Sequence, residues 1–166
     1  MDIKTIFESL STALDLEISL IEDSYEIKIK VAPEGLHQLL ARCKQDPELA
    51  FDALTNQTGI HVDESIQLYY VLYSYSHHHE LMVNCEVPLE GGEAPSVVDL
   101  WPGADWLERE TYDLLGVQFT GHPDLKRIML PEDWEGHPLR KDYVFPESYQ
   151  GIDNRPSEIT KSFQQK

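Results

Sequence analysis

The densest group of potential metal ligands in the sequence is the run His77-His78-His79-Glu80. A zinc hydrolase of the zincin type needs a helical H-E-x-x-H, because that spacing puts both imidazoles on one face of a helix. Here His79-Glu80 is followed by Leu81-Met82-Val83, so the second histidine is missing. The run also lies between two segments with the pattern of strands. We therefore predict that this run is a polar turn. The alternative, a metal site, would be supported if the purified protein contained equimolar zinc.

The two cysteines, Cys43 and Cys85, are far apart and form no C-x-x-C. An iron–sulfur cluster needs about four thiolates and a structural zinc about four Cys or His ligands. We predict that both are small core residues. The sequence has no G-x-S-x-G elbow, Gly91-Gly92 lacks the further glycines of a nucleotide loop, and no spacing among the acids singles out a glycosidase-like pair.

The chain has a net charge of −17 with neutral histidines. No Lys or Arg occurs between Lys44 and Arg109, while twelve Asp or Glu lie from Asp46 to Glu108. Such a surface repels phosphate backbones and anionic lipid headgroups, which argues against nucleic-acid binding and against polybasic membrane binding. A solvated acidic face and a face that docks on a cationic partner both remain open.

The longest apolar runs are far too short for a spanning helix, and the start Met1-Asp2-Ile3-Lys4 lacks the apolar core of a signal peptide. We therefore expect a soluble protein that stays in the cytoplasm and meets a membrane only through partners. A chain of 166 residues with 41% hydrophobic residues can build one core and carry an additional arm.

Hydrophobic periodicity predicts the elements that position these residues. In chain order they are a helix at 2–14, a hairpin over 16–31 with its turn at 22–24, a helix from Pro33 through Cys43, a short turn that continues to Leu54, a strand at 66–75 with the composition of one covered on both faces, its antiparallel neighbour at 81–87, a loop at 88–95, and a helix at 104–115 closed by Gly116.

These elements predict an α+β fold. We expect a mixed, largely antiparallel sheet of about five strands, with the helices mainly on one face. Residues 1–120 form this domain, and residues 121–166 form an extended, loop-rich C-terminal arm, because prolines and glycines recur there and the strand and helix periods fade. An arm with so little core of its own is a common means of wrapping a neighbouring protein.

The predicted helix at 104–115 carries charged residues that recur at helical spacing. One face is predicted to be mainly apolar, with the members Ala104, Leu107, Thr111, Leu114 and Leu115. Asp105, Arg109 and Asp113 stand opposite at i, i+4 and i+8 and can form a ladder of alternating charge in solvent. Glu110 lies at the edge of the apolar stripe, where Trp106, Glu110 and Asp113 would make a mixed patch. Helix geometry alone favours a solvated face over a contact surface.

Three consecutive segments of the sequence resemble one known family. The central one is Glu108-Arg109-Glu110-Thr111-Tyr112-Asp113-Leu114-Leu115-Gly116, followed by Gly121-His122-Pro123-Asp124-Leu125-Lys126-Arg127-Ile128-Met129. Residues 95–106 and 130–143 extend the likeness to about fifty residues. The E-R-E-x-x-D pair of turns, the His and the Lys resemble the diagnostic motif of the 30 kDa subunit family (the C subunit) of respiratory complex I, the NADH:quinone oxidoreductase.

The resemblance implies a structural subunit of the peripheral arm of this proton-translocating enzyme, with no catalytic residue of its own. FMN, iron–sulfur clusters and quinone would be bound by partner subunits and not by this chain. The implied partners are the quinone-site D subunit, of the 49 kDa type, and the cluster-bearing B and I subunits, on the cytoplasmic side of the inner membrane. The residues implied to form the subunit interface are Glu108, Arg109, Glu110, Asp113, His122, Lys126, Arg127, Arg140, Lys141 and Asp142.

An interface role for these residues makes a prediction for single substitutions. Removal of one partner of a buried ion pair between subunits costs several kcal/mol, so Arg109→Ala or Glu110→Ala should impair assembly on a native gel. The electron donor stays open, because membrane-bound hydrogenases and ferredoxin-linked photosynthetic complexes use related subunits. Neighbouring genes would separate these possibilities from the NADH-linked enzyme.

Overall fold

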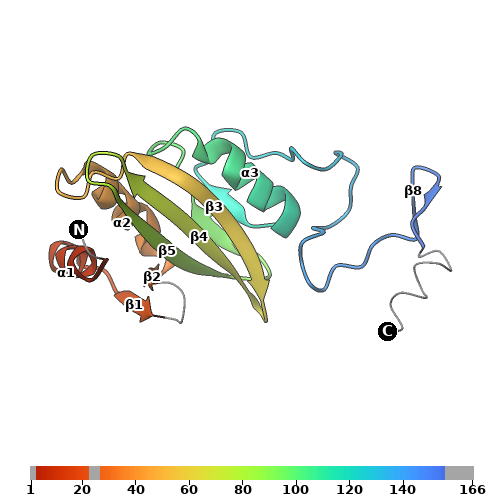
Figure 1. Cartoon of the computed structure of the whole chain (residues 1–166). Helices are drawn as coiled ribbons and strands as arrows, with labels where there is room; N and C mark the ends of the chain where they lie inside the picture. The colour runs from red at the N-terminus through yellow and green to blue at the C-terminus, as the bar shows by residue number, and fades with distance from the viewer. Residues whose placement is uncertain (1–2, 23–26, 156–166) are drawn as a thin grey trace.

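The computed structural model describes residues 3–22 and 27–155. In chain order, the elements within these ranges (Figure 1) are α1 (Ile3–Ala13), β1 (Ile18–Glu22), β2 (Ile27–Val31), α2 (Pro33–Gln45), β3 (Ala53–Val62), β4 (Ser65–Ser74), β5 (His79–Pro88), β6 (Glu93–Pro95), α3 (Ala104–Leu115), β7 (Gln118–Thr120), β8 (Ser148–Tyr149) and β9 (Ile152–Asp153).

Five strands form the main sheet, in the order β1-β2-β5-β4-β3. β2 and β5 are parallel, whereas β1 with β2, β4 with β5 and β3 with β4 are antiparallel. A parallel pair needs a crossover connection, and here the connection contains α2 and the β3–β4 hairpin. The predicted α+β class, with a mixed, largely antiparallel sheet of about five strands, is confirmed.

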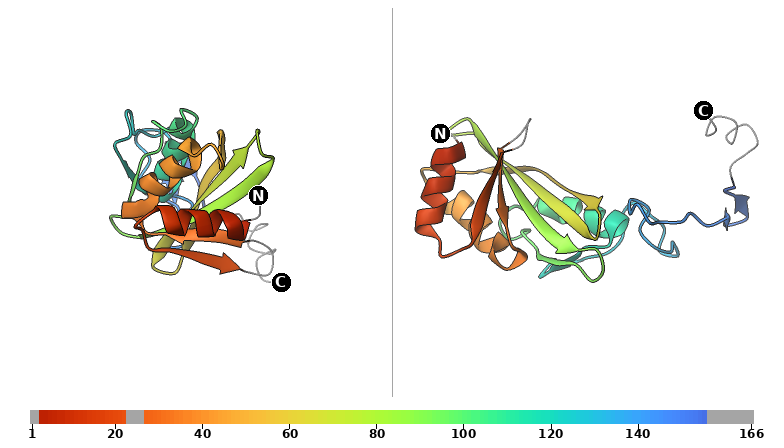
Figure 2. Two further views of the ribbon diagram at one scale, coloured as in Figure 1. Left: turned by 90° about the vertical axis from the view of Figure 1, so that its left-hand side faces the viewer. Right: turned by 90° about the horizontal axis from the view of Figure 1, so that it is seen from below.

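The helices α2 and α3 lie on one face of the sheet, as Figure 2 shows, and α1 lies beside β1 and β2. α2 begins at Pro33, whose fixed φ suits the first helical turn. It buries Leu36, Leu39, Leu40 and Cys43, which follow each other at helical spacing and therefore face the sheet together. The predicted position and apolar stripe of this helix are confirmed, and so is the placement of the helices mainly on one face.

The residues of β4 alternate between the core and a half-exposed face. Its core side consists of Ile66, Leu68, Tyr70 and Leu72, together with Ser74 at the end. The other side, which carries Tyr69 and Tyr73, is only half-buried. The prediction that this segment is covered on both faces is therefore wrong within the described chain. Its pairing with the strand that follows, now β5, is confirmed.

The strand β3 is absent from the sequence-based prediction. The expected short turn is present at residues 47–49, but its extension through Leu54 is wrong, because β3 begins at Ala53 and pairs with β4 along most of its length. Its two buried positions are the polar residues Gln57 and His61. An edge strand with polar residues on its buried side shows no hydrophobic alternation, so the pattern on which the prediction depended is missing.

Two short strands frame α3. β6 and β7 pair in parallel, with Ala94 opposite Phe119, so the expectation that residues 88–95 form only a loop is wrong at the end of that segment. The predicted hairpin over 16–31 is confirmed by the β1–β2 pairing, although its turn falls mainly on residues 23–26, outside the described residues. Among residues 3–22 and 27–155, no helix combines the length and apolar character needed to cross a bilayer.

The chain from Gly121 to Arg155 contains only the two-residue strands β8 and β9 as regular structure. Its first part, up to Arg140, packs against α3. The remainder extends away from the sheet and ends in the β8–β9 hairpin, drawn in blue in Figure 1. An extended C-terminal arm is therefore present. The boundary at residue 120 remains a proposal about how the chain divides.

Candidate functional site

Helix α3 is held close to the edge strand β3. A Cβ atom added at Gly59 would lie 2.7 Å from Leu115 Cδ1 and 3.3 Å from Thr111 Cγ2, so glycine allows this approach. Thr111 Oγ1 donates a 3.0 Å hydrogen bond to Gln57 Oε1 across the same contact. The helix ends at Gly116, whose φ of 82° is left-handed, as the sequence predicts for a glycine that closes a helix.

The charged side of α3 is buried, so the predicted solvated face is wrong. Glu108 and Asp113 are 0% exposed and Arg109 is 8% exposed. Of the predicted ladder, Arg109 Nη1 lies 3.9 Å from Asp105 Oδ1, but Asp113 pairs with Arg127 in the arm. The first part of the arm packs over this side of the helix and replaces the solvent that helical spacing alone would assign to it.

Asp113 binds four groups of the arm at once. Its Oδ1 accepts a 3.0 Å hydrogen bond from Arg127 Nη1. Its Oδ2 accepts main-chain N–H bonds from Ile128, Met129 and Leu130 at 3.0, 2.8 and 3.0 Å. A carboxylate that accepts several N–H bonds and faces a guanidinium is stable in its charged form even when buried. Asp113 therefore fixes the path of the arm against α3.

Arg109 makes the second attachment between α3 and the arm. Its Nε donates a 3.2 Å hydrogen bond to the carbonyl oxygen of Lys126. Its guanidinium carbon lies 5.2 Å from the centre of the Trp106 ring, within cation–π distance. Trp106 is 63% exposed and Glu110 is exposed, so these two form a surface patch. Asp113 does not belong to this patch, contrary to the prediction, because it is buried.

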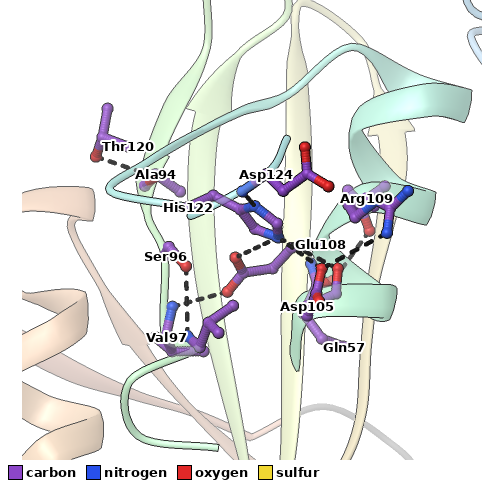
Figure 3. Close-up of polar contacts among 12 residues, drawn as sticks. Gln57, Ala94, Ser96, Val97, Asp105, Glu108, Arg109, Thr120, His122 and Asp124 are labelled. Atoms are coloured by element: carbon purple, nitrogen blue, oxygen red, sulfur yellow. Dashed lines mark hydrogen bonds and ion pairs between the residues drawn. The ribbon is translucent and has the colours of Figure 1, made fainter. Parts of the chain in front are cut away.

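A third attachment joins His122 to two carboxyl groups of α3 (Figure 3). His122 Nε2 lies 3.3 Å from Asp105 Oδ1 and 4.0 Å from Glu108 Oε2, and its side chain is fully buried. Glu108 Oε1 accepts a 2.7 Å hydrogen bond from the N–H of Val97. Burial raises the pKa of Glu108 to about 7, against the opposing effect of the hydrogen bonds from Val97 and Ser96.

The C-terminal end of α3 is capped by the arm. The last turn of a helix leaves carbonyl oxygens without partners in the helix, and here three of them accept hydrogen bonds from the arm. The pairs are His137 Nδ1 to Asp113 O at 2.9 Å, Leu139 N to Leu114 O at 3.0 Å, and Arg140 Nε to Leu115 O at 2.7 Å. The positive guanidinium is also favourable at this end of the helix dipole.

The last attachment before the arm leaves the body is to β3. The N–H of Lys141 donates a 2.9 Å hydrogen bond to Nδ1 of the buried His61, whose Nε2 donates to the carbonyl oxygen of Asp63 at 2.7 Å. Asp142 Oδ1 lies 3.7 Å from the same Nδ1. The two buried positions of β3 are polar because His61 faces the arm and Gln57 faces Thr111 of α3.

The ten residues predicted for an interface occupy three environments. Glu108, Arg109, Asp113 and the side chain of His122 are buried within the chain; Arg127 and Arg140 are partly buried; Glu110, Lys126, Lys141 and Asp142 are exposed. The structure gathers nine of them, all but Glu110, in or beside the contacts between the arm and the body. The chemistry of this cluster is that of ion pairs and hydrogen bonds between segments.

Two kinds of residue at this site were not predicted. His61 of β3 binds the arm, and His137 of the arm binds the end of α3. Only knowledge of β3 and of the path of the arm could have revealed them. The second kind is the large apolar residue in the arm. Exposed fractions are 84% for Val144 and 60% for Phe145, and Met129, Leu139 and Ile152 are similarly exposed. The sequence did hold a signal for these exposed residues, since they are apolar residues among polar and turn-forming ones.

The other chemically suggestive residues have structural partners. Residues 75–78 form the turn between β4 and β5, as predicted. His77 Nε2 and His79 Nε2 donate to the carbonyl oxygens of Pro47 and Leu49. Burial lowers the pKa of His79.

Both cysteines are buried in the core, as predicted. Burial raises the pKa of Cys43 and of Cys85 to about 12, so both thiols are protonated at neutral pH. A protonated thiol is a poor metal ligand and a poor nucleophile, because the thiolate is the reactive form. These two residues therefore serve the packing of the core.

Comparison with known proteins agrees with the geometry. Residues 29–149 match the family model described as the 30 kDa subunit of the respiratory-chain NADH dehydrogenase. The C subunit of the NADH-quinone oxidoreductase of Roseiflexus castenholzii is 38% identical over 81% of this chain and 80% of its own length. That of Acidothermus cellulolyticus is 37% identical over 68% of this chain and 60% of its own length.

Solved structures show the same fold. The trypsin-resistant fragment (1–134) of Nqo5 aligns with a TM-score of 0.63 and 26% identity, over 75% of this chain and all of the fragment. A chain of the membrane-bound sulfane sulfur reductase, an archaeal respiratory membrane complex, aligns with a TM-score of 0.73 and 21% identity over 95% of this chain, a likeness of fold alone. The match to the family model and the identity to these relatives show that this chain belongs to the 30 kDa subunit family of the respiratory NADH-quinone oxidoreductase (complex I).

Proposed function

We propose that this chain is a non-catalytic scaffold of the complex and binds its neighbours through the distal part of the arm. The observation that carries the proposal is a contrast within the arm. Up to residue 141 the arm is tied to α3 and β3 by buried polar contacts. Beyond that point Val144 and Phe145 are exposed, and an apolar pair held in water gains free energy when a partner covers it.

The interface residues divide into two groups under this proposal. Glu108, Arg109 and Asp113 act indirectly, because their contacts within the chain set the path of the arm. Glu110 and Lys141 are exposed and are free to contact a partner directly. This division refines the expectation from the sequence that all ten residues lie in the interface between subunits.

We propose that the cofactors of the reaction are bound by neighbouring subunits. The quinone-site D subunit, of the 49 kDa type, and the cluster-bearing B and I subunits are the proposed contacts, with the chain on the cytoplasmic side of the membrane. The two cysteines support this division of labour, since their raised pKa values make them unsuitable ligands for a cluster. A visible spectrum of the purified chain should show nothing above the aromatic band, and a brown protein with reconstitutable clusters would overturn the proposal.

The test of the scaffold proposal is a double substitution, Val144→Ser with Phe145→Ser, in the full chain in its own cell. We expect less assembled complex on a native gel and a parallel loss of NADH:quinone activity, with the thermal unfolding of the chain unchanged, since both side chains are exposed. Ile60→Ser is the matched control, because Ile60 is an apolar residue of the body and is 50% exposed. Normal assembly of the double variant would contradict the proposal.

A further inference from the structure

The buried carboxyl group of Glu108 lacks a cation of its own. Oε1 accepts the N–H of Val97, whereas Oε2 receives no hydrogen bond within the described residues, and its nearest ion-pairing group is His122 Nε2 at 4.0 Å. Arg109 is directed to Asp105 and to the carbonyl oxygen of Lys126 instead. A buried carboxylate without a partner is costly, and such a group is neutralised by a proton.

The protonation state of His122 follows from its hydrogen bonds. The N–H of Asp124 donates to His122 Nδ1 at 3.0 Å, and a ring nitrogen that accepts a hydrogen bond carries no proton. The proton of the ring is therefore on Nε2, which donates to the carbonyl oxygen of Asp105 at 3.3 Å. The imidazole is neutral and provides no positive charge that could balance an ionised Glu108.

The other groups around Glu108 do not supply a positive charge. The titratable neighbours are Asp99 in the loop after β6, Asp105 on α3, His122 in the arm and Tyr70 on β4. Asp99 and Asp105 further raise the pKa of Glu108, beyond the larger effect of burial. Burial also raises the pKa of Tyr70 well above its ordinary value, so the phenol stays neutral.

We propose that Glu108 is a buried proton-binding site whose ionisation loosens the first residues of the arm, which the ring of His122 holds to α3. Below neutral pH the proton is on Glu108 Oε2, and Nδ1 of His122 accepts the N–H of Asp124. At alkaline pH the proton leaves Oε2 for the solvent. The buried carboxylate then favours hydration. Water that enters here competes for the two hydrogen bonds of the His122 ring, to the carbonyl oxygen of Asp105 and from the N–H of Asp124, and so loosens residues 121–126.

The test is a titration of the full chain with ¹³C-labelled glutamate carboxyl groups, followed by NMR. We expect one glutamate to be half-protonated at about pH 7, and its resonance to be absent from Glu108→Gln. Glu110→Gln is the matched control, because Glu110 lies two residues away on the same helix and is exposed. The high-titrating resonance must remain in that variant. Ionisation of every glutamate by about pH 6 would overturn the proposal, as would persistence of the signal in Glu108→Gln.

Two further measurements follow the arm directly. Hydrogen exchange of the Asp124 amide should accelerate in the wild type relative to Glu108→Gln by about tenfold or more between about pH 6 and about pH 8.5; a constant ratio would contradict the coupling. If Glu108→Gln does not fold, the test is made on the wild type at about pH 6. There the ¹⁵N chemical shifts of the His122 ring report whether Nδ1 carries a proton. A bare Nδ1 supports the proposal, and a doubly protonated ring overturns it.

Discussion

The attachment of the arm to α3 depends most on Asp113, and Asp113→Asn tests this dependence. The amide has the size of the carboxyl group but carries no charge, and one of its two polar atoms is a donor. Its single oxygen can replace only one carboxylate oxygen. Either Arg127 or the three N–H groups of residues 128–130 therefore lose their acceptor.

The expected loss follows from the number and kind of these bonds. A hydrogen bond to a charged group contributes about 1.5–3 kcal/mol, but the four bonds share one carboxylate and their effects do not add. Loss of one partner from a buried ion pair costs about 3–5 kcal/mol. We expect a loss of about 3–5 kcal/mol, which is first expressed as local opening of the arm while the sheet stays folded.

Limited digestion with trypsin detects this opening. Between residues 121 and 155 of the wild type the first cut should follow Lys141, which is exposed. Arg155 precedes a proline, and trypsin does not cleave that bond. A cut after Lys126 or Arg127 requires this segment to leave α3. In Asp113→Asn the fragment that ends near residue 127 should form at least about a hundredfold faster, as an opening cost lowered by about 3 kcal/mol implies.

The control for this experiment is Asp124→Asn. Asp124 lies in the same part of the arm, but its side chain is 59% exposed and pairs with Lys126 at the surface, where solvent and salt screen an ion pair and leave it little effect on stability. Its cleavage pattern should match the wild type. If Asp113→Asn also gave the wild-type pattern and the wild-type rate, the carboxylate would not be what holds the arm, and the reasoning above would be wrong.

Three further predictions concern single residues. The pKa of Glu108 rises from 4.5 to about 7 on folding, so the stability that its protonated form contributes is present below about pH 4.5 and is lost as pH rises through about 7. Over this window the free energy of unfolding measured in urea should fall by up to about 3 kcal/mol more in the wild type than in Glu108→Gln. Equal losses in the two proteins would contradict this. Gly59→Val should cost about 1–3 kcal/mol in chemical denaturation, because the new side chain meets Leu115 and Thr111, whereas Gly103→Ala, where a Cβ meets nothing within 4 Å, serves as control. Arg109→Ala should lower both the Tm of the purified chain and the amount of assembled complex, while Glu110→Ala should lower assembly alone; a Tm change in Glu110→Ala would argue against a direct contact role.

The sequence predicts well those elements whose apolar residues make the pattern. In α2 the buried stripe, and in α3 the closing Gly116, are visible in the letters alone, and the β4–β5 pair alternates clearly. The predicted stripe of α3 holds only in part, because Leu107 and Leu114 are partly exposed while Glu108, Arg109 and Asp113 are buried. β3 fails for the opposite reason. Its buried side holds Gln57 and His61. Each makes one hydrogen bond to a distant segment, Gln57 to α3 and His61 to the arm, and these partners come from about fifty to eighty residues further along the chain.

The candidate site shows the same limit on the side of α3. Helical spacing placed Asp105, Arg109 and Asp113 on one side correctly, but it could not say that the arm covers them. A charged stripe on a helix normally faces water because burial of a charge is costly. Asp113 is buried nonetheless, since the arm supplies four donors, and no rule applied to the helix alone contains that information.

The direction of synthesis gives this arrangement a consequence for biogenesis. Asp113 leaves the ribosome before Arg127 and the three amides that it binds, and the parallel pairing of β2 with β5 is already possible by then. A nascent or truncated chain that stops before residue 127 would thus hold the complete main sheet beside a carboxylate that lacks all four of these donors. Chaperones or proteases should recognise such a product as immature. Only chains that carry the complete first part of the arm would then enter assembly.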